Sequence, residues 1–282
     1  MTHVSNRIDA KFKALKALNR AAFITYIQGG DPTADISQDI LMGLPKSGAD
    51  IIELGMPFSD PAADGPAIDK AAQRALKAGA TTRKTLEMVR KFRAQDNDTP
   101  IVLMGYFNPI YAYGLENFCR DAVSAGVDGL IIVDLPPEED AELLAPANAH
   151  NIHVIRLATP TSDDARLPHI LDGASGFLYY VAVAGVTGGK SATSTMISKA
   201  VERIRKHTDM PVAVGFGIRT KDQARMMAKR ADAAVVGSAI VQKIADGITT
   251  LENGDHLYKD GLIEEVLDFV RELADGVRTA RT

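Results

Sequence analysis

Short apolar runs that alternate with amphipathic stretches constrain the fold of this chain more than any other feature. Each run is rich in Val, Ile, Leu or Tyr and is bounded by Gly, Pro or Asp, which is the pattern of a strand buried in a parallel sheet. Their spacing fits a repeat of strand, loop, helix and loop. We expect eight strands, at residues 22–27, 51–54, 101–104, 130–133, 154–157, 177–181, 212–214 and 234–236.

The stretches between these runs carry apolar residues at helical spacing, and several begin at Thr, Ser or Asp, which are good N-cap residues. Before the first strand, Ile8, Phe12, Leu15 and Leu18 predict an amphipathic helix over about residues 7–19 that covers the floor of the fold. We expect the other helices at residues 36–47, 84–94, 116–125, 138–150, 163–171, 194–206, 221–229, 240–244 and 262–277.

Eight strands that alternate with helices predict an α/β fold of the (β/α)8 or TIM-barrel class, with its active site at the carboxyl ends of the strands. The alternative is an open doubly wound sheet, which usually has fewer strands and a glycine-rich fingerprint after its first strand. The segment Gln28-Gly29-Gly30-Asp31-Pro32 is not such a fingerprint. Without a linker-like tract, we expect residues 1–282 to form one domain, with the barrel over about residues 22–250.

Composition excludes several classes of function. The 282 residues carry a net charge of -4 and no Lys/Arg-rich stripe, which argues against nucleic acid and anionic membranes as partners. The single cysteine, Cys119, and histidines without ligand spacing make a metal site unexpected. No segment reaches the length of an uncharged membrane span, and no export signal is evident, so we expect a cytoplasmic protein.

The loop after the second strand carries the densest chemical signal. Glu53 ends a strand that is otherwise Ile and Leu, so its carboxylate should point into the barrel mouth, where burial moves the pKa toward that of a general acid/base. Asp64 follows in a loop stiffened by Pro and Gly and can return over the same mouth. The alternative is that Glu53 pairs with a Lys or Arg and that Asp60 and Asp64 are turn residues.

Glycines follow the last three strands, at residues 182–191, 215–220 and 237–240. Glycine lets backbone N–H groups approach an anion, and phosphate sites in barrels recur after the seventh and eighth strands. The alternative is that these glycines only serve tight turns. The run Gly189-Lys190-Ser191 resembles the end of a P-loop, but that pattern requires Gly where the chain has Ala184. We expect a mobile lid there, with a nucleotide hydrolase as the open alternative.

The run ELGMPFSDPAADGP at residues 53–66 resembles the signature of the tryptophan synthase alpha chain family. The resemblance extends over about residues 7–274 through five further motifs in order. These are GGDP at 29–32, GYFNP at 105–109, VDLP at 133–136 and GVTG at 185–188, with GFG at 215–217 after them.

The resemblance implies a lyase without a cofactor of its own, which cleaves indole-3-glycerol phosphate to indole and glyceraldehyde 3-phosphate. Glu53 would be the general acid/base, Asp64 would hold the indole N–H, and Tyr179 would be the active-site tyrosine. It further implies substrate-binding roles for Phe23, Met104, Tyr106, Ile131, Thr187, Gly188, Gly217, Gly237 and Ser238. The chain departs from some members at Val183, where they carry Arg, and at Ala182 and Ala184, where hydroxyl side chains are common.

The resemblance also implies a partner, a beta chain that carries pyridoxal phosphate, in an α2β2 heterotetramer. The loops at residues 56–60 and 107–109 would meet this partner, through Pro57, Asp60 and Asn108. Two alternatives stay open: a catalytically weak subunit that mainly activates its partner, and another phosphate-binding barrel enzyme of the same pathway.

Overall fold

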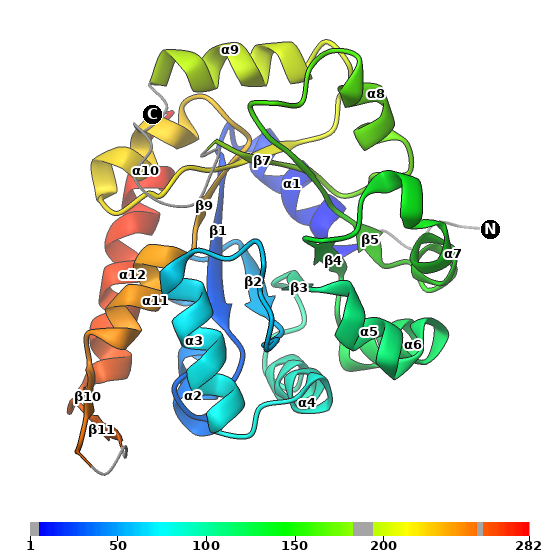
Figure 1. Ribbon diagram of the computed structural model, residues 1–282. Coiled ribbons are helices and arrows are strands. Elements are labelled where there is room, and N and C mark those ends of the chain that lie inside the picture. The colour runs from blue at the N-terminus through cyan, green and yellow to red at the C-terminus, as the bar shows by residue number, and fades with distance from the viewer. Residues whose placement is uncertain (1–5, 183–193, 253–255, 282) are drawn as a thin grey trace.

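The computed structural model describes residues 6–182, 194–252 and 256–281 (Figure 1). Its parallel sheet has the strand order β5-β4-β3-β2-β1-β9-β8-β7-β6. The strands of this sheet are β1 (Ala22–Gln28), β2 (Ile51–Gly55), β3 (Ile101–Gly105), β4 (Gly129–Ile132), β5 (His153–Val154), β6 (Arg156–Ala158), β7 (Leu178–Val181), β8 (Val212–Gly215) and β9 (Ala233–Val236).

The two ends of this sheet belong to one stretch of chain. Only Ile155 separates β5, which pairs with β4, from β6, which pairs with β7. The Ile155 backbone N–H donates to the Leu130 carbonyl at 2.9 Å, so pairing with β4 continues past the interruption. The cylinder thereby closes, and the predicted barrel with eight strand positions is confirmed.

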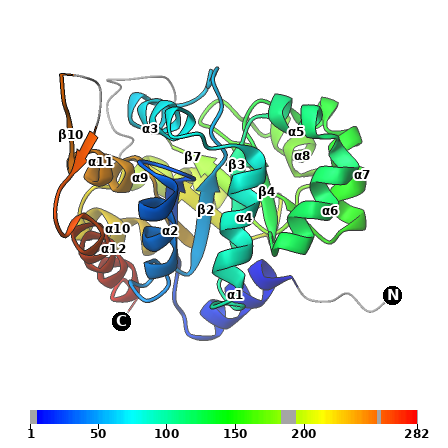
Figure 2. The same ribbon diagram turned by 90° about the horizontal axis from the view of Figure 1, so that it is seen from below.

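Helices surround this cylinder and follow its strands in alternation (Figures 1 and 2). They are α1 (Arg7–Ala17), α2 (Ala34–Gly43), α3 (Pro66–Lys77), α4 (Thr82–Arg93), α5 (Phe107–Tyr113), α6 (Leu115–Ala125), the 3-10 helix η1 (Pro137–Glu139), α7 (Ala141–Ala149), α8 (Arg166–Leu171), α9 (Ser194–Ile204), α10 (Lys221–Ala228), α11 (Ser238–Ala245) and α12 (Leu262–Arg278). No helix in the described part of the chain is long and apolar enough to span a membrane.

Two helices and one hairpin were not predicted. The inward face of α3 consists of Ala71, Ala72 and Ala75, and such small side chains give a weak apolar signal. Helix α5 has only seven residues, too few for a helical period to stand out. The antiparallel hairpin of β10 (Ile248–Thr250) and β11 (His256–Tyr258) projects from the barrel beside α11 and α12 (Figure 1).

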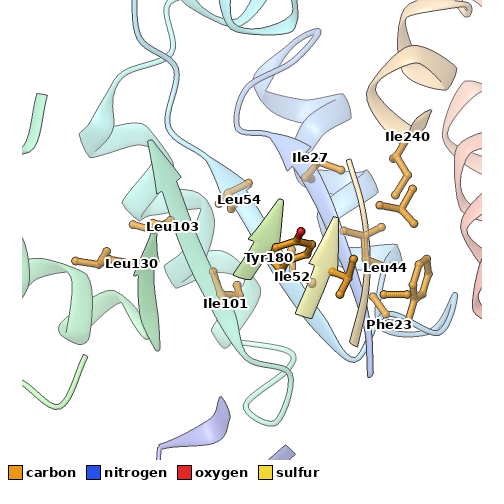
Figure 3. Close-up of a cluster of buried hydrophobic side chains, with 14 of the residues drawn as sticks. Phe23, Ile27, Leu44, Ile52, Leu54, Ile101, Leu103, Leu130, Tyr180 and Ile240 are labelled. Carbon is orange, nitrogen blue, oxygen red and sulfur yellow. The ribbon is translucent and has the colours of Figure 1, made fainter. Parts of the chain in front are cut away.

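The core has two layers because successive strand residues point to opposite faces. Ile52 and Leu54 of β2 point outward, into the layer between sheet and helices that Figure 3 shows. Ile51 of the same strand points into the barrel, where it packs with inward residues of the other strands. Glu53 therefore also points inward, as predicted.

Helix α1 seals the amino-terminal end of the barrel. Its N-cap Asn6 accepts a hydrogen bond from the Ile8 N–H at 2.9 Å, and Ile8, Phe12 and Leu15 pack against the inner layer. The Phe12 and Phe177 rings lie 5.7 Å apart between centroids. The predicted floor helix is confirmed (Figure 2), but Leu18 is 72% exposed because the helix ends at Ala17 and Leu18 serves as its C-cap.

Candidate active site

A cavity of about 920 Å³ opens at the carboxyl ends of the strands. Its wall includes inward residues near the ends of β1, β2, β3 and β7, and loop residues that follow β2, β8 and β9. These residues include Tyr26, Glu53, Asp64, Met104, Tyr106, Tyr179, Gly217, Gly237 and Ser238. The structure thus brings together residues that lie far apart in the sequence.

Glu53 is an isolated acid in this wall. Its side chain is buried, with 1% of the residue exposed, and its Oε1 has no hydrogen-bond partner within the described residues. Burial raises its pKa to about 8, because the low-dielectric surroundings disfavour the carboxylate. We find no ion pair of Glu53 with a Lys or Arg among residues 6–182, 194–252 and 256–281. The group can therefore hold a proton at neutral pH and release it to a bound molecule.

Asp64 has a different environment in the same wall. It is half-buried, and burial raises its pKa to about 6, while a hydrogen bond with Tyr106 acts in the opposite direction. The Tyr106 hydroxyl also accepts a hydrogen bond from the Ala63 backbone N–H at 3.0 Å. This tyrosine, from the end of β3, thereby ties the loop after β2 over the mouth of the barrel. At neutral pH Asp64 is mainly ionised, whereas Glu53 is mainly protonated.

Tyr179 enters the cavity from β7, four strand positions from β2 in the sheet order. In a barrel with eight strand positions, this places Tyr179 on the side opposite Glu53. Burial raises the pKa of Tyr179, and the negative charge of Glu53 raises it further. The phenol therefore stays protonated and can donate a hydrogen bond to a molecule between the two walls.

Tyr26 is a wall residue that the sequence interpretation missed. Its hydroxyl donates to Gln28 Oε1 at 2.7 Å, and Gln28 Nε2 donates to the Gly55 carbonyl at 3.0 Å. Phe23 was expected in this wall but lies in the outer layer, with no part in the cavity lining. Because successive residues of β1 point to opposite faces, Phe23 and Tyr26 cannot both point inward. Phe23 is therefore not a wall of this pocket.

The two other predicted apolar walls differ from each other in depth. Met104 lines the cavity. Ile131 points into the barrel but lies in the packed inner layer, outside the cavity lining. Ile131 therefore supports the wall from below and does not face the open space.

A glycine-lined rim lies on the side of β8 and β9. Gly217 adopts φ +65°, and a Cβ there would meet no atom within 4 Å, so its backbone faces open space. Gly237 is the N-cap of α11, and Ser238 is its first residue. Backbone N–H groups and the partial positive charge of a helix start favour an anion here. Arg219 also lines the rim, and the sequence interpretation missed this cation directly after the glycine run.

The other predicted residues are not among the described residues that line this cavity. Thr187 and Gly188, with Val183, Ala184 and the expected lid, lie outside the described residues. Asp60 and Asn108 are exposed on the loop after β2 and on α5. Pro57, which the resemblance placed with them at the partner surface, is buried. Within the described part of the chain, no group of three or more His, Cys, Asp or Glu side chains could hold a metal ion.

Fold and cavity together define a class of protein. It is an α/β barrel whose mouth combines a buried, proton-holding carboxyl group, a second acid in a more polar setting and a rim of backbone N–H groups suited to an anion. The family model for the tryptophan synthase alpha chain matches residues 12–268. The chain belongs to the tryptophan synthase alpha chain family.

Solved structures agree with this family. An Aquifex aeolicus VF5 protein shares 38% identity with a TM-score of 0.86, over 97% of this chain and 100% of that chain. The tryptophan synthase alpha chain from Legionella pneumophila shares 36% identity with a TM-score of 0.85, over 97% of this chain and 98% of that chain. A chain of Mycobacterium tuberculosis tryptophan synthase shares 36% identity with a TM-score of 0.85, over 97% of this chain and 99% of that chain.

Proposed function

We propose that this protein is the alpha subunit of a tryptophan synthase and cleaves indole-3-glycerol phosphate to indole and glyceraldehyde 3-phosphate by a retro-aldol reaction. The observation that carries the proposal is the buried Glu53, with its pKa raised to about 8 and with Asp64 in the wall of the same cavity. Retro-aldol cleavage requires one group that first gives a proton and then takes one.

Glu53 begins the reaction as the protonated acid and donates its proton to C3 of the indole ring. The ring nitrogen then carries positive charge. The resulting Glu53 carboxylate takes the proton of the glycerol hydroxyl next to the ring, a carbonyl forms, and the bond between C3 and the glycerol carbon breaks. The bond's electron pair returns to the ring and neutralises the nitrogen. Indole and the aldehyde leave, and Glu53 is protonated as at the start.

Asp64 stabilises the charged intermediate. Its carboxylate accepts a hydrogen bond from the N–H of the indole ring. This interaction is strongest when the nitrogen is positive, so it stabilises the transition state more than the substrate. Tyr179 donates a hydrogen bond across the cavity, and Tyr106 holds Asp64 in place. Gly217, Gly237 and Ser238 bind the substrate phosphate at the opposite rim.

The proposed partner is a beta chain that carries pyridoxal phosphate and consumes indole in an α2β2 complex, in the cytoplasm. Asp60 and Asn108 are exposed near the mouth, and Asn108 lies in α5 beside Tyr111, which is 60% exposed. The Phe107 and Tyr111 rings of α5 lie 5.7 Å apart, so the helix presents an aromatic surface. An exposed aromatic surface of this kind suits an interface with another protein.

Indole release from indole-3-glycerol phosphate tests the proposal. Glu53→Gln keeps the volume of the side chain but cannot exchange a proton, so we expect turnover to fall by at least about 10²-fold. Glu87→Gln, an exposed change of the same kind on α4, is the matched control and should keep wild-type turnover. Turnover of Glu53→Gln above about a tenth of wild type would contradict the assignment.

Measuring the isolated chain separates the alternatives. A catalytically silent activator would show no single-turnover cleavage without a beta chain, whereas the proposed lyase cleaves slowly alone and faster with its partner. Another phosphate-binding enzyme of the pathway would deplete a precursor and leave indole-3-glycerol phosphate intact.

A further inference from the structure

A second cavity, of about 770 Å³, lies beside the first one. Its lining comes from β4, β5 and β6, from the loops that follow β4 and β6, and from α7 and α8. Val133, Leu157 and Thr159 line both cavities, so a single layer of side chains separates them. No step of the proposed reaction uses this second cavity.

Arg156 of β6 is the unusual residue in its wall. The residue is buried, with 6% exposed, and its Nη2 forms an ion pair with the buried Asp140. Its Nε and Nη1 are also buried and have no hydrogen-bond partner among the described residues. A buried guanidinium with unused donors is costly, since each donor has lost its water. The fold makes room for this group, because a Cβ on Gly173 would lie 3.1 Å from Nη2.

The remaining charged groups of the cavity wall already have partners. Arg166 pairs with Glu138, and its second contact with that carboxylate is 2.9 Å long. The Asp163 carboxylate accepts the backbone N–H of Arg166 at 2.8 Å. The Asp134 carboxylate accepts the first backbone N–H of α5, also at 2.8 Å. Arg156 is therefore the charged wall group of the second cavity whose buried donors lack acceptors in the described structure.

The rest of the lining indicates the shape of a ligand. Leu143 and Ile170 provide an apolar wall from α7 and α8, and Thr159 and Thr161 bring hydroxyl groups to the mouth. We propose that this second cavity binds a small molecule with an apolar body and a terminal oxyanion, a carboxylate or a phosphate ester. On binding, a small shift of the Arg156 side chain turns Nε and Nη1 toward the cavity, where the oxygens of the ligand accept their hydrogen bonds. Arginine is the side chain best suited to such oxyanions.

Nuclear magnetic resonance of the full chain tests this proposal with three probes of similar shape. Benzoate and phenyl phosphate present the two oxyanions, and benzamide is the neutral control. We expect the Arg156 Nε–H and the Leu143 amide to shift saturably with one or both anions up to about 20 mM, the range of weak small-molecule binding. No saturable shift with either anion, or equal binding of benzamide, would overturn the proposal.

Variants locate the binding. Arg156→Lys keeps a cation beside Asp140 but removes the guanidinium donors, and we expect affinity to fall at least about tenfold. Thr161→Trp changes an exposed residue at the mouth, so it tests the site without altering the core, and it should block binding. Gly217→Asp changes only the first cavity and should leave the Leu143 shift intact. Binding unchanged in Thr161→Trp, or lost in Gly217→Asp, would show that the probes bind elsewhere.

Discussion

A Cβ on Gly215 would lie 2.5 Å from the hydroxyl oxygen of Tyr179. The glycine at the end of β8 therefore makes room for the tyrosine that reaches in from β7. We predict that Gly215→Ala lowers indole formation at least about tenfold, because the added methyl group displaces the phenol. Tyr179→Phe removes the clashing oxygen, so the double variant should be more stable than the sum of the single changes. Thermal unfolding of all four proteins measures this coupling, and strict additivity would contradict it.

The raised pKa of Glu53 predicts a dependence of stability on pH. Between about pH 4.5 and pH 8 the unfolded chain has lost this proton while the folded protein keeps it. The stabilisation that the protonated Glu53 gives the folded state is therefore fully present below pH 4.5 and is lost as the pH rises to about 8. The wild type should lose a few kcal/mol of unfolding free energy between these pH values, and Glu53→Gln, which does not titrate, should not lose this amount. Denaturant unfolding at several pH values checks this, and parallel curves for the two proteins would contradict it.

Two acids with different pKa values predict a bell-shaped profile of kcat/KM against pH. In the proposed reaction Asp64 is ionised, which sets an acidic limb near pH 6, and Glu53 is protonated, which sets a basic limb near pH 8. Tyr106→Phe removes a hydrogen bond that lowers the pKa of Asp64, so the acidic limb should move to higher pH while the basic limb stays. If both limbs moved, or neither did, the claim that Tyr106 controls the pKa of Asp64 would be contradicted.

Asp64→Asn should reduce kcat by about 10² to 10³-fold and change KM far less, because an amide cannot stabilise a positive ring nitrogen as a carboxylate does. Steady-state kinetics on the folded variant distinguish the two parameters. A variant with normal kcat and raised KM would make Asp64 a substrate-binding group instead.

The glycine-lined rim predicts a strong penalty for negative charge. Gly217→Asp places a carboxylate where the phosphate should approach the backbone, and we expect KM to rise at least about tenfold. Gly217→Asn is the matched control, since it adds the same volume in the same φ +65° backbone without the charge. Equal effects of both variants would indicate a steric cause, and an unchanged KM for Gly217→Asp would place the phosphate elsewhere.

The proposed partner surface is tested by Asp60→Ala and Asn108→Asp, because both side chains are exposed near the mouth. We expect both variants to bind the beta chain more weakly and to be activated less, with smaller effects on the basal rate of the isolated chain. Calorimetric titration with the beta chain measures the affinity. Wild-type affinity and activation in both variants would refute this interface.

The barrel and its acid were predictable because they depend on local patterns. Each strand is a compact apolar run, and Glu53 stands out as the one charged residue in its run. The phase of β1 was not predictable, since a strand buried on both faces lacks the polar alternation that would identify its inner side. The resemblance implied Phe23 as a pocket wall, and the strand pattern carried no signal that would have pointed to Tyr26.

Features that depend on distant pairs were also beyond prediction. Nothing near Arg156 in the sequence indicates that Asp140 occupies one of its nitrogens and leaves two unused. Likewise, the contact of Tyr106 with Asp64 joins the end of β3 to the loop after β2. Such pairs form only when the cylinder closes, so they become visible in the folded structure.

Because α1 closes the bottom of the barrel, it restricts the route by which small molecules reach the cavity. Ile8, Phe12 and Leu15 join the packed interior below Glu53, so the amino-terminal end of the barrel is closed. In the described part of the chain the interior is thus closed at this end, and under the proposed function substrate and products pass through the opposite end, where Asp60 and Asn108 are exposed. A subunit bound over that open end would control when indole leaves and in which direction, without having to bind indole itself.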